Sequence, residues 1–228
     1  MSPRALHDSL WVLESPMRAG PLELGTRTAI VRRADGGLVV HSPGPIAGDG
    51  ATEAAVAALG PVRALIAPNA LHHLFLGAWS RAFPEAECFA APGVAAKQPE
   101  LKLVELGAAP PPAWAGTLDQ LPLAGMPRVC EVAFFHPASR SLILTDLCFH
   151  VRRGPWLTRA LLRVNGAWDR FGMSRIGRSL VRDRAALRRS LDALLEWDFD
   201  RIVVAHGDVL EHGGRAALRE AFAWLDNT

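Results

Sequence analysis

The sequence predicts an α/β protein of the α+β kind, in which two mixed β-sheets pack together as a sandwich and helices cover the outer faces. In each half of the 228-residue chain, apolar strand-like runs come first and strand–helix units follow. Half of the residues are apolar and 21% are charged, which is typical of a folded protein with a sizeable core. No stretch has the composition of a linker, so we expect residues 1–228 to form a single domain.

The first half is predicted to begin with antiparallel strands. Apolar runs at residues 27–33 and 38–43 flank the turn sequence Ala-Asp-Gly-Gly, a pattern typical of a hairpin. A further strand is expected at residues 8–15. After the hairpin, the composition favours a helix at 50–60, which ends on a glycine, and then a short apolar strand at 62–68.

A longer amphipathic helix is predicted to follow. Apolar residues from Leu71 to Phe83 recur at spacings of three and four, Asn69 is a suitable N-cap, and Pro84 would end the helix. The pattern then predicts, in order, a strand at 86–93, loops over 91–117 around a short helical turn at 94–98, strands at 118–125, 128–137 and 141–146, helices over 155–196, a strand at 200–208 and a terminal helix at 213–225.

The composition excludes several classes of protein. The N-terminal residues contain no uninterrupted apolar run of the kind found in a signal peptide, and no segment reaches the roughly 20 apolar residues of a membrane span. We therefore expect a cytoplasmic protein without a transmembrane segment. The three cysteines are an odd number and widely spaced, so neither a disulfide framework nor a thiolate zinc site is predicted.

The formal charge of +2 conceals an uneven distribution of arginines. Eleven arginines lie between His150 and Ser190, against only Asp169 and Asp183. This arginine-rich helical segment, at about residues 151–196, is suited to contact with an anion, although a solvated helical face is the commoner explanation. The near-neutral net charge argues against a large surface for nucleic acid.

Five polar side chains lie at the predicted ends of strands, where α/β sheets usually place their sites. They are His72, His73, His136, Asp146 and His206. Imidazole nitrogen and carboxylate oxygen are ligands of zinc and similar divalent ions, so these side chains would form a metal site if they converge. Each also has a structural interpretation, such as the start of a turn for His136, a turn cap for Asp146 and a loop hydrogen bond for His206.

Taken together, the segments NALHHLFLGAW, FFHPASRSLILTD and IVVAHGD resemble the metallo-β-lactamase superfamily. The narrower resemblance is to a bacterial family described as a domain of unknown function, DUF4336, and it covers nearly the whole chain. The resemblance implies an αββα sandwich and a metal-dependent hydrolase. It also implies that His136 is the middle histidine of the metal site, Asp146 the metal-bridging aspartate and His206 the histidine of the last strand.

The first metal-binding motif departs from the superfamily pattern His-x-His-x-Asp-His. In one register His73 takes the place of the last histidine and His72 that of the aspartate, with proline and alanine at the first two histidine positions. In the other register Asn69 comes first, a leucine second, and His73 takes the aspartate's place. In both registers two strong ligands are missing.

The missing ligands change the number of metal ions that the resemblance implies. The site that relies on the first two histidines retains only His136, and we expect it to be empty. The other site is expected to be mononuclear, with His72, His73 or both, Asp146 and His206 around one divalent ion, by preference zinc and otherwise iron or manganese. Hydroxide generated on the metal would attack an ester, lactone or phosphoester, and Asp146 or His73 would orient or deprotonate the water.

The resemblance also suggests a place for the substrate. Helices that follow the bridging aspartate tend to overhang the cleft in this superfamily, so Arg152, Arg153 and Arg159 would bind an anionic small molecule. The rival hypothesis is a metal-free pseudoenzyme that binds a ligand or a protein through the same cleft. The missing histidines of the first motif favour this rival, and the retention of the three later metal-binding residues disfavours it.

Overall fold

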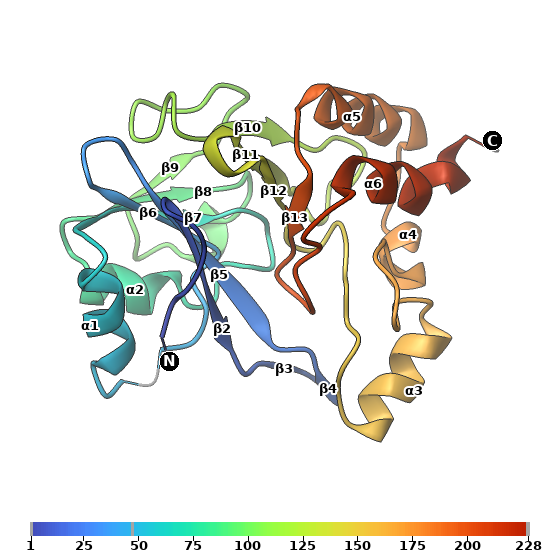
Figure 1. Cartoon of the computed structure of the whole chain (residues 1–228), viewed down its shortest axis with the longest axis horizontal. Coiled ribbons are helices and arrows are strands. Elements are labelled where there is room, and N and C mark those ends of the chain that lie inside the picture. The colour runs from blue at the N-terminus through green and yellow to red at the C-terminus, as the bar shows by residue number, and fades with distance from the viewer. Residues whose placement is uncertain (1, 47, 227–228) are drawn as a thin grey trace.

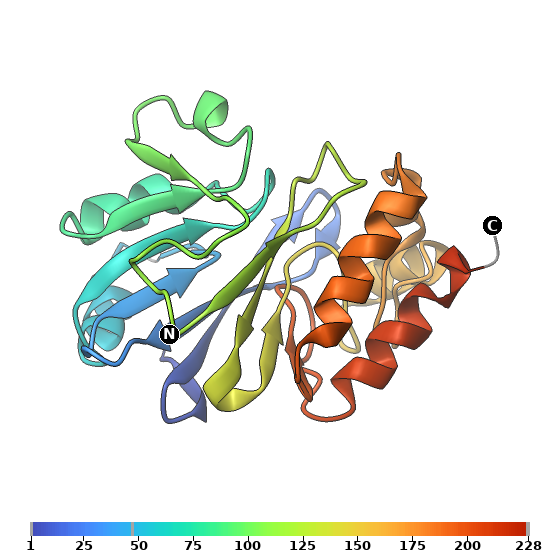
Figure 2. The ribbon, with the colours of Figure 1, turned by 90° about the horizontal axis from the view of Figure 1, so that it is seen from above.

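The chain folds into four layers in the order helix, sheet, sheet, helix. A computed structural model describes residues 2–46 and 48–226. Two β-sheets face each other, and helices cover the outer face of each (Figure 1 and Figure 2). The predicted αββα sandwich is confirmed. In the described residues, no helix has the length and apolar character that crossing a membrane requires.

The first sheet contains seven strands in the spatial order β1-β2-β5-β6-β7-β8-β9. Its pairs are antiparallel from β1 to β6 and parallel from β6 to β9, so a meander passes into parallel crossovers. The strands are β1 (Arg4–His7), β2 (Leu10–Ser15), β5 (Thr26–Arg32), β6 (Leu38–His41), β7 (Val62–Ala67), β8 (Glu87–Ala90) and β9 (Leu103–Glu105). On its outer face lie α1 (Ala51–Ala57) and α2 (Leu76–Ala82).

The second sheet contains four strands in the order β10-β11-β12-β13. Only the last pair is parallel. The strands are β10 (Asp119–Pro122), β11 (Val132–His136), β12 (Ser141–Ile143) and β13 (Arg201–Val203), and the helices on this side are α3 (Trp156–Val164), α4 (Arg175–Ser179), α5 (Arg184–Glu196) and α6 (Gly214–Phe222). A small separate hairpin joins β3 (Arg18–Ala19) to β4 (Leu22–Glu23), and the 3-10 helices are η1 (Ala95–Lys97), η2 (Pro137–Ser139) and η3 (Ala223–Leu225).

Successive side chains of the strands in the second sheet point to opposite faces, and this divides the apolar core into two clusters. Val132 and Phe134 of β11 belong to the cluster between the two sheets, while Ala133 and Phe135 belong to the cluster under α5 and α6. Successive side chains of a strand point to opposite faces, so a sheet covered on both sides becomes apolar throughout. This double burial explains why β11 reads as a nearly continuous apolar run.

The helix after β7 begins five residues later than the sequence predicts. It starts at Leu76 rather than at Leu71, and residues 69–75 form turns. The Asn69 carboxamide oxygen accepts the backbone N–H groups of Leu71 and His72, while Lys97 and Gln98 donate to backbone carbonyls of the same segment. These side-chain bonds compete with the helical pattern, so Asn69 caps a turn instead of the helix.

Other differences from the predicted elements are smaller. The predicted helical segment 155–196 contains three separate helices, α3, α4 and α5, with irregular chain at 165–174. Within 91–117 the predicted helical turn is η1, but the structure adds β9 at the edge of the first sheet. A three-residue edge strand depends on the backbone partners that the sheet offers rather than on its own sequence.

The loops that follow β12 and β13 pair with each other at one end of the second sheet. The His150 N–H donates to the His206 carbonyl at 3.0 Å, and the Asp208 N–H donates to the His150 carbonyl at 2.8 Å. Gly207 lies between these bonds with φ of 97°, and a Cβ at this position would overlap the His150 backbone. Only glycine permits this close approach of two loops.

We predict that Gly207→Ala lowers the free energy of unfolding by about 2–4 kcal/mol, because it combines an unfavourable φ with a backbone clash. Gly213→Ala is the matched control, since Gly213 has φ of 73° but no neighbour within 4 Å of an added Cβ. It should lower the free energy of unfolding by only about 1–2 kcal/mol. Urea denaturation measures both values, and equal losses would contradict the proposed close approach.

Candidate metal centre

Three side chains from the ends of three strands converge at one end of the sandwich. His72 follows β7 in the first sheet, Asp146 follows β12, and His206 follows β13 in the second sheet. The His72 Nε2 lies 3.3 Å from Asp146 Oδ2, and the His206 Nε2 lies 3.6 Å from Asp146 Oδ1. In the part of the chain that the structure describes, these three residues form a group able to hold a metal ion, with one ligand atom from each within 4.8 Å of the others.

Asp146 is held in place by two neighbouring polar side chains. The Asn69 Nδ2 donates to Asp146 Oδ2 at 2.7 Å and to Thr145 Oγ1 at 2.9 Å. The Glu131 carboxylate accepts the backbone N–H groups of residues 145, 146 and 147 at 2.7, 2.8 and 2.8 Å. Asn69 therefore joins the His72 turn to the Asp146 loop, and Glu131 fixes the backbone of that loop.

Hydrogen bonds made by the Nδ1 atoms orient both imidazoles. The His206 Nδ1 lies 2.7 Å from the Gly25 carbonyl oxygen. A carbonyl only accepts, so this nitrogen carries the proton and, in the neutral imidazole, Nε2 presents a lone pair to Asp146. The His72 Nδ1 lies 2.8 Å from Ser42 Oγ. Ser42 adopts a positive φ of 54°, an uncommon conformation for a residue other than glycine and one that often accompanies functional sites.

Arg27 ties the loop of His206 to the first sheet. Its side chain is 5% exposed and donates to the carbonyls of Val204 at 2.5 Å and Gly207 at 2.6 Å, on either side of His206. It also pairs with Glu14 at 2.9 Å. The two sheets are thus joined on both sides of the imidazole.

The pKa values of the group reflect a balance between burial and opposite charge. Burial acts to raise the pKa of Asp146, but His72 and His206 hold it well below its ordinary value. Burial acts to lower the pKa of His72, but the Asp146 carboxylate raises it above its ordinary value. Burial, followed by the charge of Asp146, raises the pKa of Glu131 to about 7, against the effect of its N–H donors. The group therefore favours an ionised Asp146 facing positive charge, which protons or a metal ion can supply.

His73 lies beside the group but does not join it. Its Nδ1 lies 3.0 Å from Gln98 Nε2, and the same amide donates to the His73 carbonyl at 3.2 Å. Because an amide nitrogen only donates, Nδ1 is the acceptor and the neutral imidazole carries its proton on Nε2. Burial, and then the charges of Lys97 and His72, lower the pKa of His73. His73 is thus a neutral histidine on the wall of the site.

His136 lies at the opposite end of the second sheet. β11 runs antiparallel to β12, so His136 pairs with Ser141 at the start of β12, five residues before Asp146. At about 3.3 Å per residue this separation is on the order of 15 Å. His136 instead contacts Ser139 Oγ at 2.6 Å and Ser9 Oγ at 3.3 Å. The structure does not bring it to the other three residues.

A cavity of about 560 Å³ opens above the three residues. His72, Asp146 and His206 line it together with His73 and two cationic side chains, Arg18 and Lys97. Most of the remaining lining is apolar and includes Met17, Leu24, Leu71, Leu74, Phe75 and Phe149. The Phe149 ring stacks on the His206 imidazole with 5.4 Å between centroids. The arrangement is that of a small-molecule site, with a few polar groups in an apolar recess.

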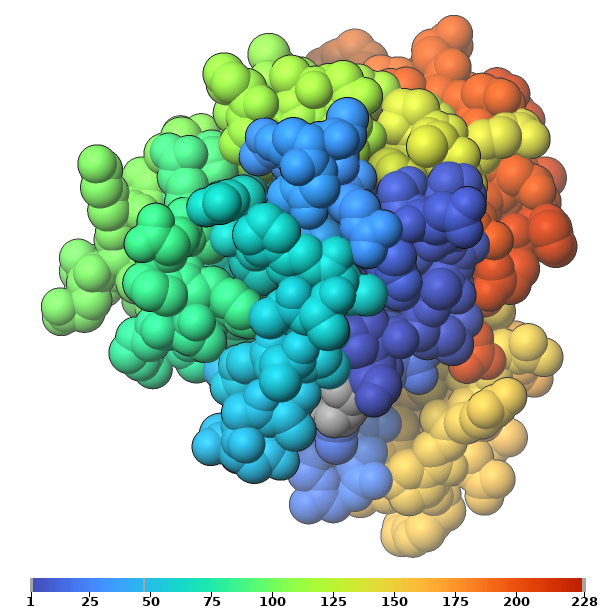
Figure 3. All heavy atoms as spheres, turned by 60° about the vertical axis from the view of Figure 1, so that its left-hand side comes forward, coloured from blue at the N-terminus to red at the C-terminus, as the bar shows by residue number. Residues whose placement is uncertain are grey.

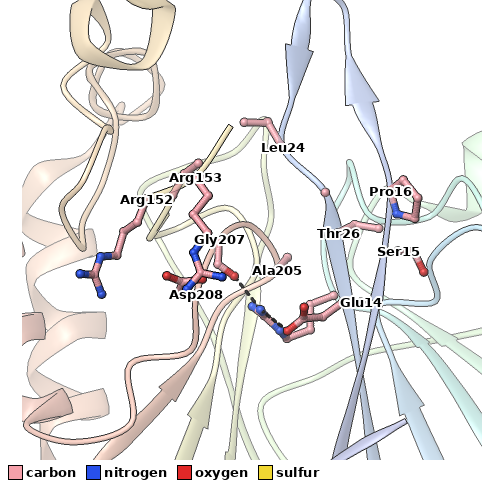
Figure 4. Close-up of a pocket in the computed structure, with 13 residues that line it drawn as sticks. Glu14, Ser15, Pro16, Leu24, Thr26, Arg152, Arg153, Ala205, Gly207 and Asp208 are labelled. Atoms are coloured by element: carbon pink, nitrogen blue, oxygen red, sulfur yellow. Dashed lines mark hydrogen bonds and ion pairs between the residues drawn. The ribbon is translucent and has the colours of Figure 1, made fainter. Parts of the chain in front are cut away.

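The arginines predicted to bind substrate lie outside this cavity. Arg152 and Arg153 line a neighbouring cavity of about 330 Å³, opposite Glu14 and Ser15 (Figure 4). The two cavities share Leu24 and Thr26 as lining residues. Arg152 pairs with Asp169 at 3.3 Å, and Arg159 is exposed on α3.

The sequence-based predictions do not include three positioning residues of the site, which are Arg27, Ser42 and Glu131. Ser42 follows a strand without any feature that marks it. Glu131, by contrast, is the one acidic residue in the apolar run RVCEVAFF, and such a charge within a buried strand indicates either a structural partner or a site. Asn69 was predicted only as a helix cap, yet its amide also holds Asp146.

The family of the chain follows from its sequence. The model of a domain of unknown function, DUF4336, matches residues 7–161, which is more than half of the chain. The chain belongs to the DUF4336 family. A comparison with curated proteins gives no significant match to this DUF4336 protein.

Solved structures with the same fold are metallo-β-lactamases and related proteins. A metallo-β-lactamase from Pontibacter korlensis has a TM-score of 0.67 at 12% identity, covering 100% of this chain and 99% of that one. The metallo-β-lactamase FIM-1 from Pseudomonas aeruginosa in the mono-zinc form gives 0.65 at 15% identity, with 99% and 94% covered. A fragment of a putative diflavin flavoprotein from Nostoc sp. gives 0.69 at 12% identity, with 99% and 96% covered. At these identities the likeness shows the fold alone.

We predict that two buried histidines make the protein sensitive to acid. Burial, followed by the charge of a second histidine, lowers the pKa of His41 to about 3 and that of His136 to about 4. Between pH 6.5 and these values the unfolded chain binds protons that the folded chain excludes, so stability falls as the pH falls. Each histidine contributes up to about 1.4 kcal/mol per pH unit. Urea denaturation from pH 7 to pH 4.5 should show a smaller slope for His136→Gln, and an unchanged slope would contradict the assignment.

We also predict that Glu131→Gln weakens the site from a distance. One end of the glutamine amide cannot accept the N–H groups of the Asp146 loop, so the free energy of unfolding should fall by about 1–3 kcal/mol. Zinc affinity should fall about 10–100-fold, as is usual when an outer-shell partner is lost. Urea denaturation and calorimetric titration with zinc measure the two effects. The exposed Glu196→Gln is the control, and equal behaviour of the two variants would disprove the positioning role.

Proposed function

We propose that this DUF4336 protein is a metal-dependent hydrolase with a mononuclear site. His72, Asp146 and His206 would hold one divalent ion, by preference zinc and otherwise iron or manganese. The supporting observation is that two imidazole Nε2 atoms face one buried carboxylate at the floor of a cavity. A neutral Nε2 and a carboxylate oxygen repel each other, so each contact needs either a proton on Nε2 or a metal ion between the two atoms, and we assign the metal ion.

The donor set fits a zinc ion. Zinc bonds of 2.0–2.1 Å in tetrahedral geometry separate neighbouring ligand atoms by roughly 3.3 Å. The His72 Nε2 lies 3.3 Å from Asp146 Oδ2 and the His206 Nε2 lies 3.6 Å from the other oxygen, Oδ1. One ligand atom from each of the three residues lies within 4.8 Å of the others, so binding of one ion would draw them closer together. The Nδ1 atoms contact Ser42 and Gly25, the kind of outer-shell contact that metal-ligating histidines make. Three protein ligands leave a position for water or substrate.

The chemistry of the bound ion would be activation of water and polarisation of a carbonyl or phosphoryl group. Asp146 would be both a ligand and the group that orients the water. His73 would donate a hydrogen bond from Nε2 to the substrate, because its Nδ1 is occupied by Gln98. The apolar lining favours an ester, lactone or phosphoester with an apolar portion, while Arg18 and Lys97 suit an anionic one. Arg152 and Arg153 would contact a substrate long enough to reach the adjoining cavity.

The neighbouring histidines provide a matched test of metal binding. His72→Ala should lower zinc affinity by more than about 100-fold, since loss of a ligand exceeds the usual effect of an outer-shell partner. His73→Ala and His136→Ala should leave it unchanged. Calorimetric titration with zinc after removal of bound metal by a chelator measures all three. Loss of affinity in His73→Ala, with retention in His72→Ala, would contradict the ligand assignment.

The same variants separate binding from catalysis. In protein loaded with zinc, hydrolysis is measured with p-nitrophenyl esters of increasing acyl length, a lactone and bis(p-nitrophenyl) phosphate. His73→Ala should reduce kcat by about 100-fold or more while zinc stays bound, because a positioned hydrogen-bond donor to the substrate is lost. Full activity in that variant would remove His73 from the mechanism.

A metal-free binding protein is the second candidate function. It is favoured by the absence, in either register, of the first two histidines of the motif and by the apolar cavity, which suits a ligand without any reaction. Elemental analysis of protein purified without chelators separates the two. Less than about a tenth of an equivalent of transition metal, with no uptake on titration, would favour the binding protein.

A further inference from the structure

The helix α3 exposes an apolar face that the rest of the chain leaves uncovered. Trp156 and Val164 are each 72% exposed, and with 3.6 residues per turn they lie about 80° apart around the helix axis. Leu157 and Leu161, exposed by 38% and 37%, lie on the same side. The opposite side carries Thr158 and Leu162, which are buried. The helix therefore buries one side against the rest of the chain and exposes a second side that is apolar.

Arginines flank this outer face. Arg159 and Arg163 lie on α3 itself, and Arg152 and Arg153 lie just before it. Among the described residues, the ion pairs join Arg152 to Asp169 but give neither Arg159 nor Arg163 an acidic partner. Ile176 on α4, 63% exposed, extends the apolar surface, and its N–H is bound by the Asn165 side chain at the end of α3. The Arg163 guanidinium lies over the Trp168 ring, 5.5 Å from its centroid. Bulky apolar groups and cations without acidic partners thus share one surface.

The surface lies directly behind the wall of the candidate metal centre. Leu162 packs in a cluster with Leu24 and Phe149, which also line the cavity above His72 and His206. The Thr158 hydroxyl accepts the backbone N–H of Glu23 in β4 at 3.0 Å, so α3 is attached to the β3–β4 hairpin. Figure 1 shows α3 beside this hairpin, and both project from the lower part of the molecule in Figure 3.

We propose that α3 docks the protein on an anionic lipid surface. Insertion of Trp156 and Val164 to the level of the headgroups would cover the apolar face, while Arg159 and Arg163 would contact lipid phosphates and carboxylates. Tryptophan favours this depth because its ring is apolar and its N–H polar. A bilayer accounts for the apolar groups and the cations together. The hairpin wall of the cavity would then lie near the lipid, on the side from which an apolar substrate arrives.

Vesicle flotation tests this proposal. The unsubstituted protein is mixed with phosphatidylcholine vesicles and with vesicles containing 30% phosphatidylglycerol, each at low and high salt. Binding to the anionic vesicles alone, with loss at 0.5 M salt, is expected because the Debye length shortens from about 10 Å at 0.1 M to about 3 Å at 1 M. Absence of binding to the anionic vesicles at low salt would overturn the proposal.

Two pairs of substitutions locate the contact. The variant R159Q/R163Q should bind anionic vesicles about 30-fold more weakly, since each basic residue near the surface contributes about fivefold. The control R182Q/R189Q removes the same charge from exposed positions beyond α3 and should keep the affinity within about threefold of the unsubstituted protein, because charges far from the lipid are screened. W156S/V164S should abolish flotation with the anionic vesicles, because the apolar groups that insert are lost, and the unsubstituted protein should show a blue shift of tryptophan fluorescence on lipid addition. Unchanged far-ultraviolet circular dichroism shows that each variant is folded.

Two other occupants of the surface would overturn the proposal. Retention on single-stranded DNA or heparin that R159Q/R163Q abolishes, without vesicle binding, would assign the arginines to nucleic acid. A dimer in sedimentation equilibrium that W156S/V164S dissociates, again without vesicle binding, would assign the apolar face to a second copy of the chain.

Discussion

The contact of two imidazoles with the Asp146 carboxylate is the interaction around which the end of the sandwich is built. His72 reaches it from the first sheet and His206 from the second, so the three side chains span the interface between the sheets. A buried carboxylate needs positive charge or hydrogen bonds to remain ionised. Asn69 donates one such hydrogen bond, and the two histidines face the carboxylate, either as protonated imidazoles or as the ligands of the proposed cation.

The surrounding hydrogen bonds all serve to keep these three side chains in place. Glu131 binds three consecutive N–H groups of the Asp146 loop, and Arg27 binds carbonyls on both sides of His206. Each buried ionised group is costly unless it is satisfied. Arg27 is held by the two carbonyls and by Glu14, whereas burial raises the pKa of Glu131 to about 7 despite its N–H donors. The arrangement keeps the Nε2 atoms in position before any ligand arrives.

The sequence predicts the fold and the position of the site more reliably than the identity of its members. Asp146 and His206 follow parallel strands, and parallel strands end at the same edge of a sheet, so their meeting is foreseeable. His136 follows an antiparallel strand and lies at the other edge, which the pattern of apolar residues does not reveal. The choice between His72 and His73 depends on a turn stabilised by Asn69, Lys97 and Gln98, and such tertiary competition with a helical pattern cannot be read from spacing. Glu131 is marked in the sequence as the one acidic residue of an apolar run, but its bonds to the Asp146 loop are visible only in the structure.

Crystals grown with zinc, measured at the zinc absorption edge, test the central claim most directly. We expect one anomalous peak within about 2.0–2.2 Å of the Nε2 atoms of His72 and His206 and of an Asp146 oxygen. A peak at His73 or His136 instead would contradict the proposed metal site. So would the absence of a peak between the two imidazoles in crystals grown with excess zinc.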